Sequence, residues 1–419
     1  MSIVFKSLQL ANGSTIKNRI CKAAMEENMA DAGQVPSQAL ITLYDVWAKG
    51  APGIILTGNV MVDPTALTGP GGVVLDKTTF EVSGNKELFE RWSKTGKAQG
   101  SQMWMQISHP GRQVYANQGT EVVSASATKV QMPGAEKMFA TARALSVSEI
   151  EILINRFADT AAAAQASGFD GVEIHAAHGY LIAQFLSPLT NLRGDTYGGS
   201  LENRARFLLS IIKAIRARVG KSFGVGVKLN SADFQKGGFD IDDAAQVVKM
   251  LNAENVDFVE LSGGSYESAA MMGMADDGRA QSTKDREMYF IDFAKDISKA
   301  AEMPIMVTGG VTQLQTAQDA LTSGHVDIIG VARAFAYAPE LPRDWETGEN
   351  VKVDIAAAKF KNPLLKALGT MALTKTQLHL MGDGKRPNFR ANALVAIIKD
   401  RLRLSKKNKR YQAWLASKG

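Results

Sequence analysis

Eight short apolar segments with the residue preferences of β-strands recur along the first 335 residues of the chain. Their ranges are 20–24, 53–57, 102–107, 171–175, 224–229, 256–262, 304–308 and 326–330. Amphipathic helical patterns separate most of them, as in residues 148–168, 202–220 and 242–256, and the first two end on glycine. This alternation predicts an α/β fold in which the strands close into a (β/α)8 TIM barrel. A doubly wound open sheet is the alternative, and we disfavour it because no G-x-G-x-x-G motif follows the first strand.

The two ends of the chain depart from this alternation. Residues 5–20 predict an N-terminal β-hairpin that turns at Asn12-Gly13. Residues 340–419 fit no further strand–helix unit and contain helical patterns such as 392–404. We therefore predict two domains, a barrel at 1–340 and a basic helical C-terminal extension at 341–419. The extension is expected to pack on the barrel or on a partner subunit.

Polar and glycine-rich positions gather where the predicted strands end. In a TIM barrel the functional residues lie at the C-terminal ends of several strands, so this clustering supports the barrel. The positions are Met25-Glu26, Gly58-Asn59, Gln106 to His109, His175 to Tyr180, Lys228 to Asn230, Ser262 to Gly264, Thr308 to Gly310, and Gly330 to Arg333.

Composition narrows the class of protein. Hydrophobic residues make up 45% and charged residues 21% of the 419-residue chain, as in an ordinary globular protein. No apolar run approaches the roughly 20 residues of a membrane span, and the N-terminus does not read as a secretory signal. A single cysteine, Cys21, excludes an internal disulfide and a cysteine-ligated iron–sulfur cluster. We expect a cytoplasmic protein that does not bind a membrane.

Positive charge is concentrated near the C-terminus. Residues 351–419 hold 16 Lys or Arg and 3 Asp or Glu, whereas the whole chain carries a net charge of +6. The segment 401–410 could contact an anionic partner. No aromatic platform or nucleic-acid motif accompanies it, so we interpret it as the solvated face of a helix and predict no nucleic-acid binding.

Two loops predict a phosphate site. Gly309 and Gly310 follow the seventh strand, and Arg333 follows the eighth. Loops at these two places in a barrel often hold phosphate, because glycines let backbone N–H groups approach its oxygens. Arg333 adds a charge-assisted contact.

Gln106 and Lys228 stand at other strand ends and face the same mouth of the barrel. A glutamine offers a donor and an acceptor to the polar edge of a heterocycle, and a lysine stabilises negative charge on that ring. A phosphorylated heterocycle such as FMN fits both ends of this site.

His175 and His178 begin at a strand end, and Tyr180 follows them. Three interpretations stay open: a metal-ligand pair, two structural histidines, or two N–H donors aimed at one substrate oxygen. We favour the third, with Tyr180 as a proton donor from the opposite side of the substrate. No convincing third metal ligand lies nearby in the sequence, and we predict no metal.

The segment 173–212, EIHAAHGYLIAQFLSPLTNLRGDTYGGSLENRARFLLSII, resembles the signature region of the Old Yellow Enzyme family of FMN-dependent ene-reductases. Residues 5–25, WMQISHPGR at 104–112 and the two loops of the predicted phosphate site are also similar to segments of that family. The resemblance covers about residues 3–340. It implies a TIM barrel with FMN, reduced by NADPH or NADH, which passes hydride from N5 to the β-carbon of an activated alkene.

The resemblance also implies residue roles. His175 and His178 match the pair that binds the carbonyl oxygen, and Tyr180 matches the proton donor. Gln106 matches the flavin-binding glutamine, whereas Lys228 stands where the family usually has arginine. The remaining cofactor-binding candidates are Ala24 and Met25 along the flavin, Asn59 at a strand end, and Gly309, Gly310, Ala332 and Arg333 at the phosphate.

Three departures from the family stand out. Glu26 replaces the Thr or Cys that often contacts the flavin, and we count it as a substrate-binding candidate. A carboxylate there predicts either an altered redox potential or a different local geometry. The chain lacks the cluster-binding cysteines and nucleotide-binding second half of the 2,4-dienoyl-CoA reductase type. The basic extension lies outside the barrel.

We therefore predict an FMN-dependent NAD(P)H:enone oxidoreductase that forms a homo-oligomer and acts on small activated alkenes. A non-flavin barrel enzyme with a metal at His175 and His178 is the alternative.

Overall fold

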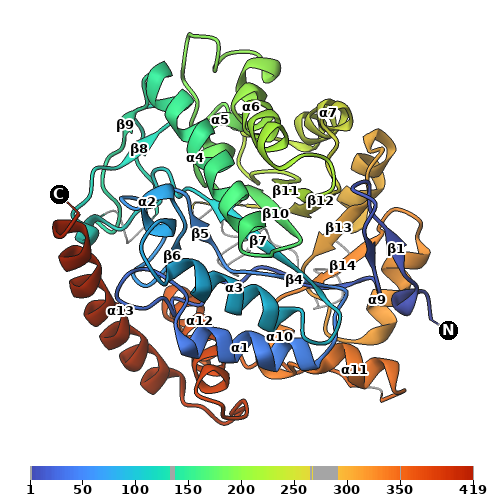
Figure 1. The fold of residues 1–419 in the computed structure, drawn as a ribbon. Coiled ribbons are helices and arrows are strands. Elements are labelled where there is room, and N and C mark those ends of the chain that lie inside the picture. Colours follow the sequence, from blue (N-terminus) through green and yellow to red (C-terminus); the bar gives the residue numbers. More distant parts are fainter. Residues whose placement is uncertain (1, 133–136, 265–266, 268–290, 350, 419) are drawn as a thin grey trace.

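The computed structural model describes residues 2–132, 137–264, 267, 291–349 and 351–418. Its centre is a closed parallel barrel in which β7 pairs with β10 and β14 pairs with β3 (Figure 1). The barrel strands are β3 (Ile20–Lys22), β4 (Ile54–Leu56), β7 (Gln102–Ser108), β10 (Gly171–Ala176), β11 (Gly224–Asn230), β12 (Phe258–Ser262), β13 (Ile305–Thr308) and β14 (Ile328–Val331). Each overlaps one predicted segment, so the predicted TIM barrel is confirmed.

Helices surround the barrel. The longer ones outside the C-terminal region are α1 (Gln38–Lys49), α3 (Asn85–Gly96), α4 (Val147–Ala166), α6 (Leu201–Val219), α7 (Ile241–Leu251) and α9 (Leu314–Thr322). Shorter ones are α2 (Lys77–Phe80), α5 (Leu181–Leu186), α10 (Ala334–Tyr337) and α11 (Leu341–Glu346). The helical patterns at 148–168 and 202–220 are confirmed by α4 and α6. The third predicted helix ends earlier than expected, at Leu251, because a short 3-10 turn follows and Asn255 takes a left-handed φ of 52° before β12.

The predicted N-terminal hairpin is present as β1 (Leu8–Gln9) and β2 (Thr15–Ile16), which pair antiparallel. Gly13 in its turn has a φ of +85°, a conformation that glycine adopts without strain. Leu10 and Ile16 join the apolar interior of the barrel with Trp104 and Phe258. The hairpin therefore closes the N-terminal end of the barrel, and the opposite end is left for the site.

The barrel interior changes from apolar to polar along its axis. Trp104 fills the lower part, and a Cβ on Gly171 or Gly224 would approach its ring to 2.6 or 2.3 Å. Two residues further along each strand come Gln106 and Glu173, which lie opposite each other in the register of β7 and β10. Alternation along a strand places these polar side chains inside the barrel above the tryptophan.

The C-terminal helices α12 (Pro363–Gly382) and α13 (Ala393–Ala416) lie against one another and against the loops that leave the barrel strands (Figure 1). The Tyr411 hydroxyl donates a hydrogen bond to the Pro64 carbonyl at 2.9 Å. Short strands β5 (Val60–Met61), β6 (Val73–Val74), β8 (Val123–Ser124) and β9 (Arg143–Ala144) complete these loops. None of the helices in the described part of the chain combines the length and the apolarity needed to cross a membrane. The division into domains at residue 340 stays a prediction.

Candidate active site

Every residue predicted for the site lies at the C-terminal end of a barrel strand or in the loop that follows. Because the barrel strands are parallel, these positions meet at one mouth. Ala24, Met25 and Glu26 follow β3; Asn59 follows β4; Gln106 is in β7; His175, His178 and Tyr180 are in or after β10; Lys228 is in β11; Gly309 and Gly310 follow β13; and Ala332 and Arg333 follow β14.

His175 and His178 lie together with Tyr180. The ring centroids of the two histidines are 5.0 Å apart, and the Tyr180 ring packs edge-on against His175 at 4.7 Å. His178 has a left-handed φ of 59°, and its backbone N–H donates to Asn230 Oδ1 at 3.0 Å. This turn folds the chain back after β10, so that the His178 ring returns towards His175.

Hydrogen bonds constrain which ring nitrogens carry protons. The Ala177 backbone N–H donates to His175 Nδ1 at 3.2 Å, so a neutral His175 carries its proton on Nε2. His178 Nε2 lies 2.7 Å from Ser262 Oγ. Among the residues that the structure describes, no group of three His, Cys, Asp or Glu side chains is arranged to hold a metal ion.

Burial keeps both histidines neutral. Desolvation, then His178 and Lys228, lower the pKa of His175 well below its usual value. Desolvation and Lys228 lower the pKa of His178 to about 3. At neutral pH each ring therefore offers one N–H donor without a positive charge.

A layer of charged side chains lies beneath the histidines. Gln106 Nε2 donates to Glu173 Oε2 at 2.6 Å, and Lys228 Nζ donates to Glu260 Oε1 at 2.5 Å. All four side chains are buried. The strand register explains the layer, because Glu173 lies opposite Gln106 and Lys228 lies opposite both His175 and Glu260.

Glu173 and Glu260 lie in the same buried layer as one lysine, Lys228, and their pKa values shift in opposite directions. Burial and Glu260 raise the pKa of Glu173 well above its usual value. Burial also opposes ionisation of Glu260, but Lys228 and the hydrogen bonds outweigh it, so the pKa of Glu260 is lowered. The layer thus holds a protonated Glu173 beside an ionised Glu260. The sequence analysis did not identify Glu173 or Glu260 as site residues. A single acid within an apolar strand, as in VEIH and VELS, could have indicated them.

Glu26 turns away from the barrel axis towards the C-terminal helices. Its Oε1 accepts a hydrogen bond from Thr68 Oγ1 at 2.5 Å, and its Oε2 lies 3.8 Å from Lys375 Nζ of α12. Of the two possibilities raised by the sequence, the structure thus shows a distinct local geometry, in which a lysine faces the carboxylate.

The mouth has features that suit a flavin with a phosphate. Asn59 Oδ1 is buried without a hydrogen-bond partner among the described residues, and it suits an N–H of a bound heterocycle. Gly310, in the loop after β13, has a φ of +70°, a conformation that glycine adopts without strain, and Arg333 caps the start of α10 after β14. The donor set of Gln106, Lys228, Asn59 and these loops fits FMN.

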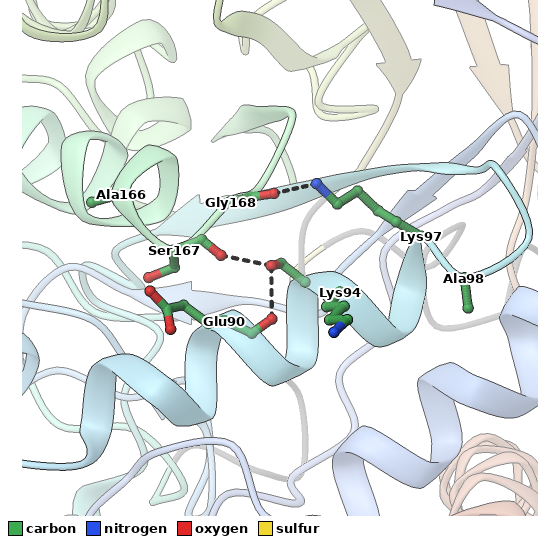
Figure 2. A pocket seen from close by; sticks show the side chains of 8 residues that line it. Glu90, Lys94, Lys97, Ala98, Ala166, Ser167 and Gly168 are labelled. Carbon is green, nitrogen blue, oxygen red and sulfur yellow. Dashed lines mark hydrogen bonds between the residues drawn. The ribbon is translucent and has the colours of Figure 1, made fainter.

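The groove shown in Figure 2 lies at the other end of the molecule. It is lined by the C-terminal turns of α3 and α4, which lead into the N-terminal ends of β7 and β10. Its polar groups bond one another: Ser93 Oγ donates to the Ser167 carbonyl at 2.6 Å, and Lys97 Nζ donates to the Gly168 carbonyl at 2.5 Å. These contacts join the C-terminal ends of the two helices.

Comparison with known proteins places the chain in a family. Residues 3–351 match the model of the NADH:flavin oxidoreductase / NADH oxidase family. The NADH-dependent flavin oxidoreductase iliE of Hypocrea jecorina is 36% identical over 385 residues, which cover 88% of this chain and 96% of the relative. The NADH-dependent flavin oxidoreductase nadA of Aspergillus parasiticus is 38% identical over 378 residues, with coverages of 88% and 83%. The NADH oxidase of Thermoanaerobacter brockii is 32% identical, but the chain spans only 50% of its length.

Solved structures agree. The Old Yellow Enzyme homologue from Zymomonas mobilis superposes with a TM-score of 0.69 at 26% identity, covering 84% of this chain and 95% of that one. A 2-naphthoyl-CoA reductase superposes with a TM-score of 0.78 at 26% identity, covering 91% of this chain and 58% of that one. The chain therefore belongs to the NADH:flavin oxidoreductase / NADH oxidase family, as its resemblance to the Old Yellow Enzymes predicted, with FMN as cofactor and a nicotinamide nucleotide as electron donor.

Proposed function

We propose that this protein is an ene-reductase that reduces C=C bonds activated by a carbonyl or nitro group, in a ping-pong cycle with NAD(P)H. One observation carries the proposal: the buried His175, the half-buried His178 and Tyr180 converge at the mouth with both imidazoles neutral, above the layer of Gln106, Glu173, Lys228 and Glu260. Neutral N–H donors aimed at one point suit an oxygen on which negative charge grows during reaction.

Residues of the mouth would hold the cofactor. Ala24 and Met25 would line its ring system, and Asn59, Gln106 and Lys228 would serve its polar edge. Gly309, Gly310, Ala332 and Arg333 would hold its phosphate. When bound, FMN supplies the hydride from N5. Because Glu260 pairs with Lys228, the lysine stays charged inside the barrel and attracts negative charge to this edge.

The two histidines bind the oxygen of the activating group. His175 offers the N–H of Nε2, since its Nδ1 already accepts the backbone bond from Ala177. If the Ser262 hydroxyl donates to His178 Nε2, the proton of that ring lies on Nδ1. Both N–H groups then polarise the activating group of the alkene, while the two rings stay neutral.

Tyr180 donates the proton that completes the reduction. Its ring packs against His175, so its hydroxyl is held near the substrate oxygen site by a side chain that binds that oxygen. A phenol is in general still protonated at neutral pH, so it can donate a proton to the carbanion that develops on the substrate. The names of the fungal relatives favour NADH over NADPH as the donor.

Separate measurement of the two half-reactions tests the proposal. The purified protein is reduced with NADH without oxygen, while its flavin absorption is followed, and is then mixed with a cyclic enone or a nitroalkene. We expect bleaching by NADH and recovery on addition of the alkene. Bleaching that is reversed by oxygen but by no activated alkene would contradict the ene-reductase activity and leave an NADH oxidase.

Tyr180→Phe tests the proton donor. We expect flavin reduction by NADH to change less than about threefold, while reoxidation by the alkene slows by about a hundredfold or more. Tyr197→Phe removes a buried phenol outside the site and serves as the matched control. Equal loss in both half-reactions for Tyr180→Phe would remove its role as donor.

A further inference from the structure

The C-terminal helices form one side of the mouth. Lys375 Nζ of α12 donates to Asn28 Oδ1 at 2.5 Å, and Lys407 Nζ of α13 donates to the Ala30 carbonyl at 2.8 Å. Asn408 Nδ2 of α13 donates to the Asn117 carbonyl at 2.9 Å. Both helices are therefore bound to the loops that follow β3 and β7, and the loop after β3 also contains the predicted cofactor residues Ala24 and Met25.

Four basic side chains lie between these helices, and we call them the rim cluster: Lys375 and His379 of α12, with Arg403 and Lys407 of α13. In each helix the two residues are four positions apart, so they share one face. Burial, then the charges of Arg403, Lys407 and Lys375, lower the pKa of His379 to about 3. Burial and Arg410 lower the pKa of Lys407 to about 8.

Acids facing the rim cluster balance only part of this charge. Glu26 lies 3.8 Å from Lys375, and Asp31 attracts Lys407. Arg403 Nη1 and Asn28 Nδ2 are buried without a hydrogen-bond partner in the described parts of the chain. Burying a donor without a partner is unfavourable, so two such donors in a region of excess positive charge suit the binding of an anion.

We propose that the rim cluster, with Asn28, binds a phosphate group of a molecule whose reactive end lies over the cofactor. The donors come from three separate segments, the β3–α1 loop, α12 and α13, and a phosphate offers them three or four oxygens and up to two charges, more than the two oxygens and single charge of a carboxylate. Glu26 faces Lys375 of the cluster and directly follows Met25, a predicted cofactor residue, so the rim cluster adjoins the segment expected along the flavin. The phosphate site is inferred from these contacts alone. The identity of the molecule that carries the phosphate rests on the proposed function.

Calorimetric titration of the full-length protein with inorganic pyrophosphate tests the site. The Arg403→Met/Lys407→Met variant should bind pyrophosphate at least about tenfold more weakly, since it removes two charge-assisted hydrogen bonds to the phosphate. Lys406→Met/Lys409→Met is the matched control, because it removes the same charge from exposed positions of the same helix. We expect the control to bind like the wild type, and malonate to bind more weakly than pyrophosphate to the wild type.

Equal weakening in both double variants would mean a diffuse charge effect and would overturn the proposal, as would tighter binding of malonate. Arg403→Lys/Lys407→Arg keeps both charges and should retain most of the affinity, which separates charge from damage to the fold. These titrations measure binding and not catalysis, so their result holds even if the protein shows no ene-reductase activity.

Measuring the two half-reactions separately distinguishes whether the bound phosphate belongs to the dinucleotide or to the substrate. With the Arg403→Met/Lys407→Met variant, a raised Kd for NADPH or NADH in flavin reduction would assign the site to the dinucleotide. An unchanged flavin reduction, with a raised KM for a phosphate-bearing enone compared with its phosphate-free analogue, would assign it to the substrate. No change in either half-reaction would contradict a phosphate site that serves this mouth.

Discussion

His175 and His178 show how burial sets the chemistry of single residues. Desolvation lowers the pKa of both rings, to about 3 for His178. Both rings are therefore neutral from mildly acidic to alkaline pH. A phenol bound over the flavin should therefore titrate only by its own hydroxyl between roughly pH 5 and 9. Absorbance titration of the phenol complex measures this directly. A second step near pH 6.5 that disappears in His178→Asn would show a charged histidine instead.

The Lys228–Glu260 pair is a second prediction for single residues. Lys228 is only 3% exposed, and its removal leaves an ionised Glu260 without a partner inside the barrel. Lys228→Met should lower the free energy of unfolding by about 3–5 kcal/mol. Lys228→Met/Glu260→Gln removes both charges and should regain part of that loss. Guanidinium unfolding followed by tryptophan fluorescence provides the comparison, and an equal loss in both variants would contradict a buried ion pair.

Among the elements, the barrel strands and two of the helices that connect them were predictable, but the side-chain contacts between elements were not. The strands read as apolar runs because a parallel barrel buries both sides of each strand, as in Gly224–Asn230. The partners of Glu173 and Glu260 could not be read from the sequence, because register across neighbouring strands decides them. The contact between Glu26 and Lys375 joins opposite ends of the chain, which local patterns do not report.

The docking of α13 depends on Tyr411. This residue is fully buried with Met61, Leu67 and Val74, and its hydroxyl bonds the Pro64 carbonyl. Tyr411→Phe should lower the stability of the α13 contact by about 1 kcal/mol, and Tyr411→Ala by about 3–5 kcal/mol. Hydrogen exchange of α13 amides measures both.

Leu402→Ala on the same helix is the control, because Leu402 is 66% exposed and should change stability by less than about 0.5 kcal/mol. Similar exchange in Tyr411→Ala and Leu402→Ala would mean that α13 is not held by this side chain.

For the whole molecule, assembly and location stay predictions. The homo-oligomer and the cytoplasmic location were inferred from the sequence and the family resemblance. Leu394, Ile398 and Leu402 stand exposed at intervals of four residues along α13. Sedimentation velocity of the purified protein at micromolar concentration distinguishes a dimer from a monomer.

The stability of the whole molecule should depend on pH through Lys22. Its Nζ donates to the Leu56 carbonyl at 2.7 Å and lies 4.1 Å from the centre of the Trp47 ring. Burial lowers the pKa of Lys22 to about 8 from the usual 10.5, despite the attraction of Glu27. Between these two values the unfolded chain binds more protons than the folded one, so the free energy of unfolding rises with pH through this window.

Lys22→Met isolates that contribution, because other groups that titrate in the same range, such as Lys407, are common to both proteins and cancel in the difference. From pH 7 to pH 9.5 the wild type should gain about 2 kcal/mol of stability relative to Lys22→Met. The measurement is the difference between the two guanidinium unfolding free energies at each pH. A difference that stays constant across the range would mean that Lys22 titrates alike in the folded and unfolded chain, and that the aromatic site of Tyr44 and Trp47 holds the charged form without penalty.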